Sequence, residues 1–201
     1  MGAVLFDRRN PALPSRATNG VGAAKKIAFN SGLATKLPEQ PLMNTAMDIT
    51  QSLQDQFAPN LICFGCGPAN EKGLQIKSYV SGDKLIASFT PQSHHRAFEG
   101  MINGGIIGVL MDCHLHWTAA WHLMQKNSLD VPPCCVTAKY EVTFENPTPS
   151  ETPLFLEAWV VEASDRKAVI DGTLGPKDSI TAKCRGTFVA VKPGHPAYHR
   201  W

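Results

Sequence analysis

A long apolar run from Met101 to Met124 constrains the fold of this chain more than any other feature. The run is long enough for a helix of about six turns, and its glycines all lie near its start. At about 100° per residue, most of its large side chains share one broad stripe, and few polar residues remain for a wet face. Such a helix needs protein on nearly all sides, so we expect the rest of the domain to wrap around it.

Six segments around this run have the alternation and composition of β-strands. Two precede it and four follow it, at residues 74–80, 84–90, 134–144, 154–163, 167–175 and 180–191. The turns between successive segments are short, which favours antiparallel neighbours. Asn44–Phe57 has the periodicity of a short amphipathic helix, and Pro91–Gly100 is expected to be a loop. We therefore predict an α+β fold in which one antiparallel sheet wraps around one long central helix.

The first part of the chain differs in composition from the rest. Residues 1–38 contain six basic residues and a single acid among Gly, Ala, Asn and Pro. We expect residues 1–43 to be a flexible extension that catalysis does not need, and an organelle-targeting segment is the alternative. The chain has 201 residues and is 43% hydrophobic, which suits one domain, expected at 44–192, followed by a tail at 193–201.

Charge and hydropathy argue against several classes of function. A net charge of +2 favours neither nucleic acid nor a membrane surface as a partner. The longest apolar stretches are interrupted by Asp, His or Gly before about 18 residues, so we expect no membrane span. The six cysteines lack the spacing of a disulfide framework, and we find no secretion signal, so we expect a reducing, cytoplasmic compartment.

One carboxylate, Asp112, interrupts the apolar run. It lies off the edge of the apolar stripe, beside Gly105, Gly108 and Ala119, with His116 one turn further on. Small neighbours would allow a substrate or a second chain to approach closely. A carboxylate in such a place activates water or attacks a carbonyl directly. The structural alternative is a carboxylate that only caps a loop or makes a buried hydrogen bond.

Two glycines, Gly104 and Gly105, lie where the long helix is expected to begin. The first backbone N–H groups of a helix have no partner within it and carry the positive end of its dipole. Glycine there lets a carbonyl oxygen approach these donors closely. We expect this end of the helix to polarise a carbonyl and to stabilise an oxyanion.

Three stretches of the sequence resemble a known family, the hotdog-fold acyl-CoA thioesterases of the phenylacetate-degradation type. CFGCGPANEKGLQI (63–76) is similar to the family's cysteine–glycine opening and its Asn-x-x-Gly-Leu turn. HRAFEGMINGGIIGVLMD (95–112) is similar to its His-Gly-Gly segment, which ends on an aspartate. TAKYEVTFENPTP (137–149) is similar to its post-helix strand with a proline-bearing turn. With the strand order, the resemblance covers about residues 60–191.

The resemblance implies a hotdog fold and the hydrolysis of an acyl-CoA thioester to a free acid and coenzyme A. It puts the catalytic carboxylate on Asp112 and the thioester-polarising N–H on Gly105. Thr137 matches a polar residue that often assists from the partner chain, and His95 falls where a histidine stands in the loop. Two chains pair to build such sites, so the expected partners are an acyl-CoA and further copies of the chain, in a dimer or a tetramer. No cofactor is expected beyond the coenzyme A of the substrate.

The sequence departs from the family's pattern beside the expected site. Asn103 replaces the histidine of His-Gly-Gly, and an amide still donates a hydrogen bond but does not titrate near neutrality. Ala97 and Glu99 stand where glycine and proline are usual, and Cys113 follows the aspartate where an acidic or small residue is common. The candidate residues are therefore, for catalysis, Asp112, Gly105, Thr137 and Asn103, and for substrate binding, Gly104, His95 and His116.

No metal site is expected from the sequence. Cys63 and Cys66 have a zinc-like spacing, but no second pair follows, so a packed thiol pair in a turn is the favoured interpretation. His114 and His116 are two apart and face different sides of a helix, so they are not a helical metal pair. His116 either bonds Asp112 or is satisfied at a contact between chains.

Two other functions stay open at this point. A hotdog dehydratase would use a histidine, His116 or His95, to abstract a proton beside the thioester. A catalytically weak acyl-CoA binding protein would follow if Asn103 marks a loss of activity. The products separate the three: free thiol for a hydrolase, an enoyl or hydroxyacyl thioester for a dehydratase, and neither for a binding protein.

Overall fold

The structure, a computed structural model, describes residues 51–198. The predicted extension at 1–43, the start of the predicted first helix and residues 199–201 lie outside this range. The elements follow in the order α1 (Leu53–Phe57), β1 (Ser78–Ser81), β2 (Lys84–Phe89), the 3-10 turn η1 (Ser93–His95), β3 (Arg96–Phe98), β4 (Met101–Ile102), α2 (Gly104–Lys126), β5 (Cys135–Phe144), β6 (Leu154–Ala163), β7 (Lys167–Gly175) and β8 (Ala182–Ala190).

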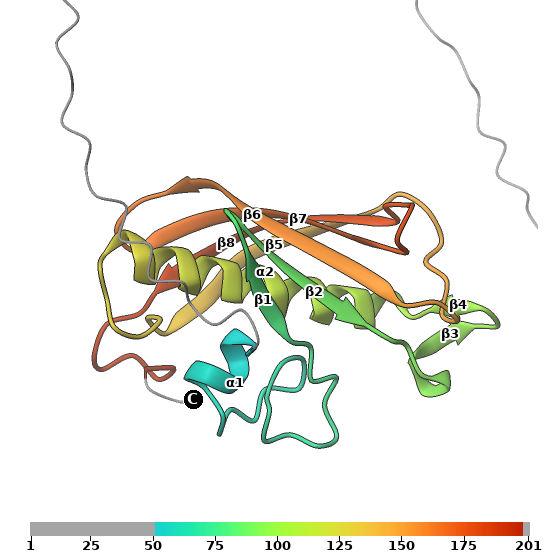
Figure 1. Cartoon of the computed structure of the whole chain (residues 1–201), viewed down its shortest axis with the longest axis horizontal. Coiled ribbons are helices and arrows are strands. Elements are labelled where there is room, and N and C mark those ends of the chain that lie inside the picture. Colours follow the sequence, from blue (N-terminus) through green and yellow to red (C-terminus); the bar gives the residue numbers. More distant parts are fainter. Residues whose placement is uncertain (1–50, 199–201) are drawn as a thin grey trace, which may run out of the picture. The chain divides into compact units, whose positions relative to one another are not determined.

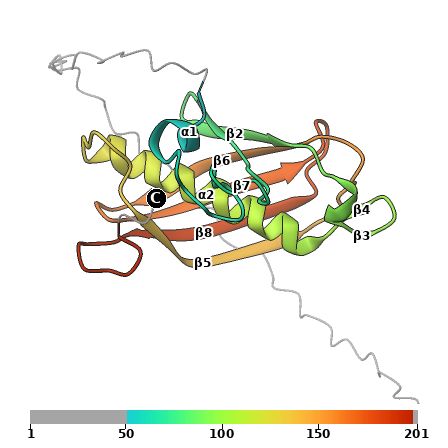
Figure 2. The same ribbon diagram turned by 90° about the horizontal axis from the view of Figure 1, so that it is seen from below.

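Six of the strands form one antiparallel sheet in the order β1-β2-β6-β7-β8-β5. The long helix α2 lies across one face of this sheet (Figure 1; Figure 2). Buried and exposed residues alternate along β2, β6, β7 and β8, because one face of each strand packs toward the core and the other faces solvent. The predicted α+β arrangement of one antiparallel sheet around one long helix is confirmed.

The helix α2 is buried on several faces, as its composition predicts. Leu110, Met111, Leu115 and Leu123 all have no exposed surface, although they point in different directions around the helix. A Cβ at Gly172 of β7 would lie 2.6 Å from a methyl of Leu115, so this glycine is what lets the helix pack closely on the sheet.

A second layer covers α2 on the side away from the sheet. Figure 1 shows α1 and the turns that follow it on that side of the helix. The rings of Phe57 and Trp121 lie 6.5 Å apart, and a Cβ at Gly65 would overlap the Cys113 sulfur. This layer is why α2 has so little polar surface.

Two segments differ from the sequence prediction. The strand predicted from residue 74 begins only at Ser78, because Gln75 has a left-handed φ of 51° and its side chain donates to the carbonyls of Pro68 and Asn70. The predicted loop at 91–100 contains η1 and β3, and β3 pairs with β4 across Gly100, whose φ is 74°. This small hairpin was predicted as a loop because its segment contains turn-forming residues.

Within residues 51–198, no helix is both long and apolar enough to cross a membrane. All six cysteines lie in this range and none forms a disulfide.

Candidate active site

Asp112 and Thr137 form the centre of the candidate site. The Thr137 hydroxyl on β5 donates a hydrogen bond of 2.8 Å to the half-buried carboxylate of Asp112 on α2. The register of β5 against β8 shifts between Thr137 and Lys139, an irregularity of the kind that re-aims side chains near functional sites. Thr137 was expected to act from a partner chain, whereas here it contacts the Asp112 of its own chain.

A cavity of about 210 Å³ opens beside this pair. Its walls are mostly apolar, and they carry the carboxylate of Asp112 and the imidazole of His116. The other lining residues are Leu61, Cys63, Cys66, Cys113, Trp117, Cys135 and Ala197. A cavity of this size and lining suits an apolar chain next to a carboxylate.

His116 shares this cavity with Asp112 as the sequence predicts. Burial lowers the pKa of His116, while the negative charges of Asp112 and Cys63 act in the opposite direction. Its ring stands edge-on to Phe188, with the ring centroids 5.8 Å apart. The neutral imidazole is therefore the favoured form near neutral pH.

The helix N-terminus carries the other predicted catalytic residues. Asn103 is the N-cap of α2, and its side-chain oxygen accepts the Gly105 N–H at 2.7 Å. The donor predicted to polarise a thioester is thus occupied by the cap, and Asn103 acts as an acceptor here. Gly104 is exposed, and a Cβ on it would lie 3.4 Å from the Phe144 ring of β5.

The two halves of the predicted site are separated along the helix. Gly105 and Asp112 are seven residues apart in α2, which corresponds to about 10 Å along the helix axis. The structure therefore brings Asp112 together with Thr137 and His116, and Asn103 together with Gly105. Ala119, predicted on the small face near Asp112, is fully buried instead.

The described geometry has counterparts among known proteins. Residues 99–182 match the model of the thioesterase superfamily. A thioesterase superfamily protein from Shewanella loihica PV-4 is 30% identical, and its structure aligns over 62% of this chain and 98% of that chain with a TM-score of 0.51. This chain belongs to the thioesterase superfamily. The hotdog fold expected for such a member is the fold described above.

Two further proteins are similar to this thioesterase-superfamily chain. A phenylacetic acid degradation-related protein from Ralstonia eutropha JMP134 aligns over 61% of this chain and 90% of that chain, with 16% identity and a TM-score of 0.50. At that identity the likeness shows the fold alone. An uncharacterized mitochondrial protein of Candida albicans (strain WO-1) is 32% identical over 106 residues, which are 52% of this chain and 40% of that protein.

His95 occupies a different place from the other predicted residues of this superfamily member. Its side chain is only 6% exposed, and its Nδ1 accepts the Gln92 N–H at 3.0 Å. Its backbone carbonyl accepts the Asn103 N–H at 2.9 Å. His95 does not line the cavity beside Asp112, and in this structure it holds the N-cap of α2 in position.

Sequence reasoning missed a buried polar network around His114. The His114 Nε2–H donates to the Leu85 carbonyl at 3.1 Å, since a carbonyl only accepts, and Nδ1 accepts from the Ser78 hydroxyl at 2.9 Å. Gln54 donates to the same hydroxyl at 3.1 Å and accepts the Ser78 N–H at 2.8 Å. The network ties α1, β1 and β2 to α2. The only sequence signal was a histidine in an apolar helix.

A cluster of three thiols was also missed. Cys63 and Cys66 lie in the turn above α2, and Cys113 lies on the helix, with 3.7 Å between the sulfurs of Cys63 and Cys113. Hydrogen bonds from the Cys113 and Cys66 thiols, together with the backbone N–H groups of Cys66 and Gly65, hold the pKa of Cys63 far below its ordinary value. We refer to Cys63, Cys66 and Cys113 as the thiol cluster.

Proposed function

We propose that this chain hydrolyses an acyl-CoA thioester to a free acid and coenzyme A. The observation that carries the proposal is the half-buried Asp112 carboxylate, held by Thr137 at 2.8 Å on the wall of an apolar cavity. A carboxylate held next to an apolar cavity is suited to act on a carbonyl whose acyl chain enters that cavity. Membership of the thioesterase superfamily supports thioester hydrolysis in general, and coenzyme A as the thiol is our addition.

Two reaction routes to hydrolysis would use Asp112. In the general-base route, Asp112 takes a proton from water, and the hydroxide adds to the thioester carbonyl. The resulting oxyanion is held by a backbone N–H, and its collapse expels the coenzyme A thiolate, which takes up the proton. In the nucleophilic route, the Asp112 oxygen forms an anhydride, which water then hydrolyses. Thr137 orients the carboxylate in both.

We propose that the N–H donor comes from a second copy of the chain. About 10 Å along one helix is too far for a carbonyl bound at Gly105 to be attacked directly by Asp112 of that helix. A bridging water would have to lie in line between them. A second helix that begins beside Asp112 removes this constraint.

The sheet supports such pairing because β5 is an edge strand ten residues long. Within the described residues it pairs with β8 alone, so its other backbone edge is open to a strand of a second copy. Tyr140 and Phe144 on this strand are 45% and 54% exposed, which is a high exposure for aromatic side chains. A dimer through β5 would cover them.

The test is thiol release from a panel of acyl-CoAs by the full chain and by Asp112→Asn. We expect Asp112→Asn to keep the fold and to lose ~10²-fold or more in turnover, the scale of removing a positioned proton acceptor. Asp83→Asn, in the exposed turn between β1 and β2, is the matched control and should retain full turnover. Unchanged thiol release by Asp112→Asn would exclude the assignment.

The dehydratase remains the second candidate because His116 lines the same cavity as Asp112. Product analysis in the same assay separates the two. A hydroxyacyl or enoyl thioester without thiol release would favour the dehydratase, and binding without turnover would favour the binding protein.

The cellular location stays a prediction. The similar protein of Candida albicans is described as mitochondrial, which supports organelle targeting by the basic residues of 1–38 over the cytoplasmic location expected first.

A further inference from the structure

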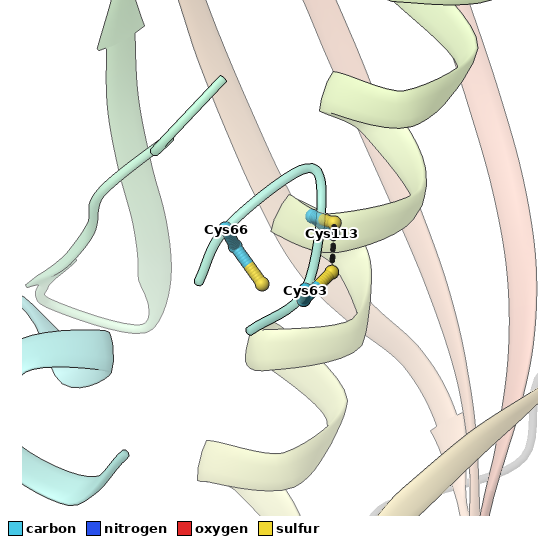
Figure 3. A group of neighbouring side chains, drawn as sticks. All are labelled: Cys63, Cys66 and Cys113. Carbon is cyan, nitrogen blue, oxygen red and sulfur yellow. Dashed lines mark hydrogen bonds between the residues drawn. The ribbon is translucent and has the colours of Figure 1, made fainter. Parts of the chain in front are cut away.

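The thiol cluster gathers three potential metal ligands from two distant parts of the chain. The three sulfurs all lie within 4.8 Å of one another. Figure 3 shows Cys63 and Cys66 on one turn, facing Cys113 on α2. Cys66 and Cys113 are 4% and 6% exposed, so two of the three thiols are shielded from bulk water.

The turn that carries Cys63 and Cys66 is shaped around a sulfur. The Gly67 N–H donates to the Cys63 carbonyl at 2.9 Å, which closes the turn. The deprotonated thiolate is the form of cysteine that binds a metal. Gly65 also lets the turn lie directly on Cys113, because a side chain there would overlap that sulfur.

We propose that Cys63, Cys66 and Cys113 bind one zinc ion through their three sulfurs. Zinc–sulfur bonds of about 2.3 Å in a tetrahedron place two sulfurs about 3.8 Å apart. The sulfurs of Cys63 and Cys113 are 3.7 Å apart in the structure. Small side-chain rotations bring the third sulfur to the same spacing, since all three already lie within 4.8 Å.

The fourth position faces the cavity beside Asp112. Three cysteines leave one corner of the tetrahedron for another donor. The cavity is lined by all three cysteines and also by His116, which is one helical turn after Cys113 and therefore on the same side of α2. A water in the cavity or the His116 imidazole, after its ring turns from Phe188, completes the site.

A zinc ion explains this cluster better than simple packing or a disulfide. Packing alone gives no reason for three sulfurs from two distant parts of the chain to lie within 4.8 Å of one another. A disulfide would join two of the sulfurs and leave the third without a role. The ion would fasten the turn at 63–66 to α2 one residue from Asp112, so it would hold one wall of the cavity in place. The inference does not depend on the proposed hydrolysis, because metal binding is measured without substrate.

The first experiment measures zinc in the full chain purified with a thiol reductant and no chelator. We expect about one zinc per chain by elemental analysis, as for a site with three thiolate ligands. Cobalt in place of zinc should give thiolate-to-cobalt charge-transfer absorption and the visible bands of a tetrahedral site. A strong chelator should lower the melting temperature, because the ion stabilises only the folded state.

The second experiment compares Cys113→Ser with Cys184→Ser. Cys184 is also buried, at 4% exposure, but lies on β8 and does not line the cavity, so it is a matched control. We expect Cys113→Ser to weaken zinc binding by more than ~10-fold and to lose the cobalt absorption, with Cys184→Ser unchanged.

Three results would overturn the proposal. The first is wild-type protein without zinc after incubation with excess zinc under reduction. The second is equal zinc binding by the wild type and by Cys113→Ser, which marks an adventitious ion only. The third is wild-type protein in which Cys63 and Cys113 form a disulfide and which then binds no zinc. The wild-type measurements decide the question even if Cys113→Ser does not fold.

Discussion

His114 has partners on both ring nitrogens although it is fully buried in α2. Burial lowers its pKa to about 4 from 6.5, with the hydrogen bond to the Leu85 carbonyl acting in the opposite direction. Between these two values the unfolded chain binds a proton that the folded chain does not. This residue therefore stabilises the fold fully above about pH 6.5, and its contribution is lost as the pH falls toward 4.

We expect the free energy of unfolding to drop by roughly 2 kcal/mol between about pH 7.5 and about pH 5 from His114 alone. Urea denaturation at the two pH values measures the drop. His95, His116 and His122 also have lowered pKa values and act in the same direction, so the comparison is with His114→Gln, which keeps these three. Over the same pH range, the free energy of unfolding of His114→Gln should drop by roughly 2 kcal/mol less than that of the wild type. An equal drop in both proteins would refute the role of His114.

At the residue scale, the sequence identified single groups but not their partners. Asp112 could be predicted because a carboxylate in an apolar helix is conspicuous, and its bond to Thr137 joins two residues that were both candidates. The partners of His114 are 29 and 36 residues away, and the sulfur of Cys63 meets Cys113 across 50 residues. No local spacing encodes such contacts, since they arise from the packing of the turn and strands on α2.

At the scale of the element, the N–H that caps the start of α2 is also the N–H that we propose for catalysis. The Asn103 side chain caps the helix by accepting the Gly105 N–H at 2.7 Å. The same N–H is the donor that we propose for the thioester oxygen. Substrate binding at this N–H would thus have to displace the Asn103 cap.

We expect Asn103→Ala to lower the free energy of unfolding by about 1 kcal/mol, the usual value of an N-cap side chain. Asn103→Asp is the matched control, because it keeps the acceptor and places a negative charge at the positive end of the helix. It should keep the stability but reduce thiol release, since that charge opposes a developing oxyanion. Urea denaturation and the thiol assay measure the two effects. If Asn103→Ala were as stable as the wild type, the hydrogen bond of the cap would not contribute to the free energy of unfolding.

Strand boundaries followed the sequence closely where alternation alone decides them. β6 and β7 begin and end at the predicted residues, because hydrophobic alternation and short turns define both. β1 is shorter than predicted because Gln75 adopts a left-handed backbone conformation that alternation does not reveal. β8 begins two residues late, at Ala182, because the N–H of Thr181 bonds back to Leu174 and Ile180 stays exposed.

At the scale of the whole molecule, one chain does not bring all the residues of the proposed site together. Asp112 and Thr137 lie together, whereas Gly105 lies about 10 Å away along the same helix. The open edge of β5 is the surface through which a second copy would bring its own helix N-terminus. We expected Thr137 to act from the partner chain, whereas its hydrogen bond to Asp112 lies within one chain. We therefore propose a different division of the site, in which Asp112 and Thr137 of one chain act with Gly105 of the other.

Complementation between two inactive variants tests this arrangement. Asp112→Asn removes the carboxylate, and Gly105→Pro removes the N–H at the second position of α2, where proline is tolerated in the first turn. Gly105→Ala keeps the N–H and is the control for the added side chain. If the site is shared, a heterodimer holds one site with both lesions and one with neither. Equal mixing makes half of the dimers heterodimers, so about a quarter of the wild-type thiol release should return.

Native mass spectrometry must show that the heterodimers form, because activity is informative only when they do. Each variant alone should stay at its own low level, and Gly105→Ala, which keeps the N–H but places a Cβ 2.9 Å from the Asn103 Oδ1, shows how much of the loss comes from the added side chain. If heterodimers form and no activity returns, Gly105 serves the Asp112 of its own helix through an intervening water. A monomeric mass with full thiol release by the wild type would remove the shared site. The expected return requires the partner's helix N-terminus to lie within hydrogen-bond reach of a carbonyl beside Asp112, which no arrangement of a single α2 provides for direct attack.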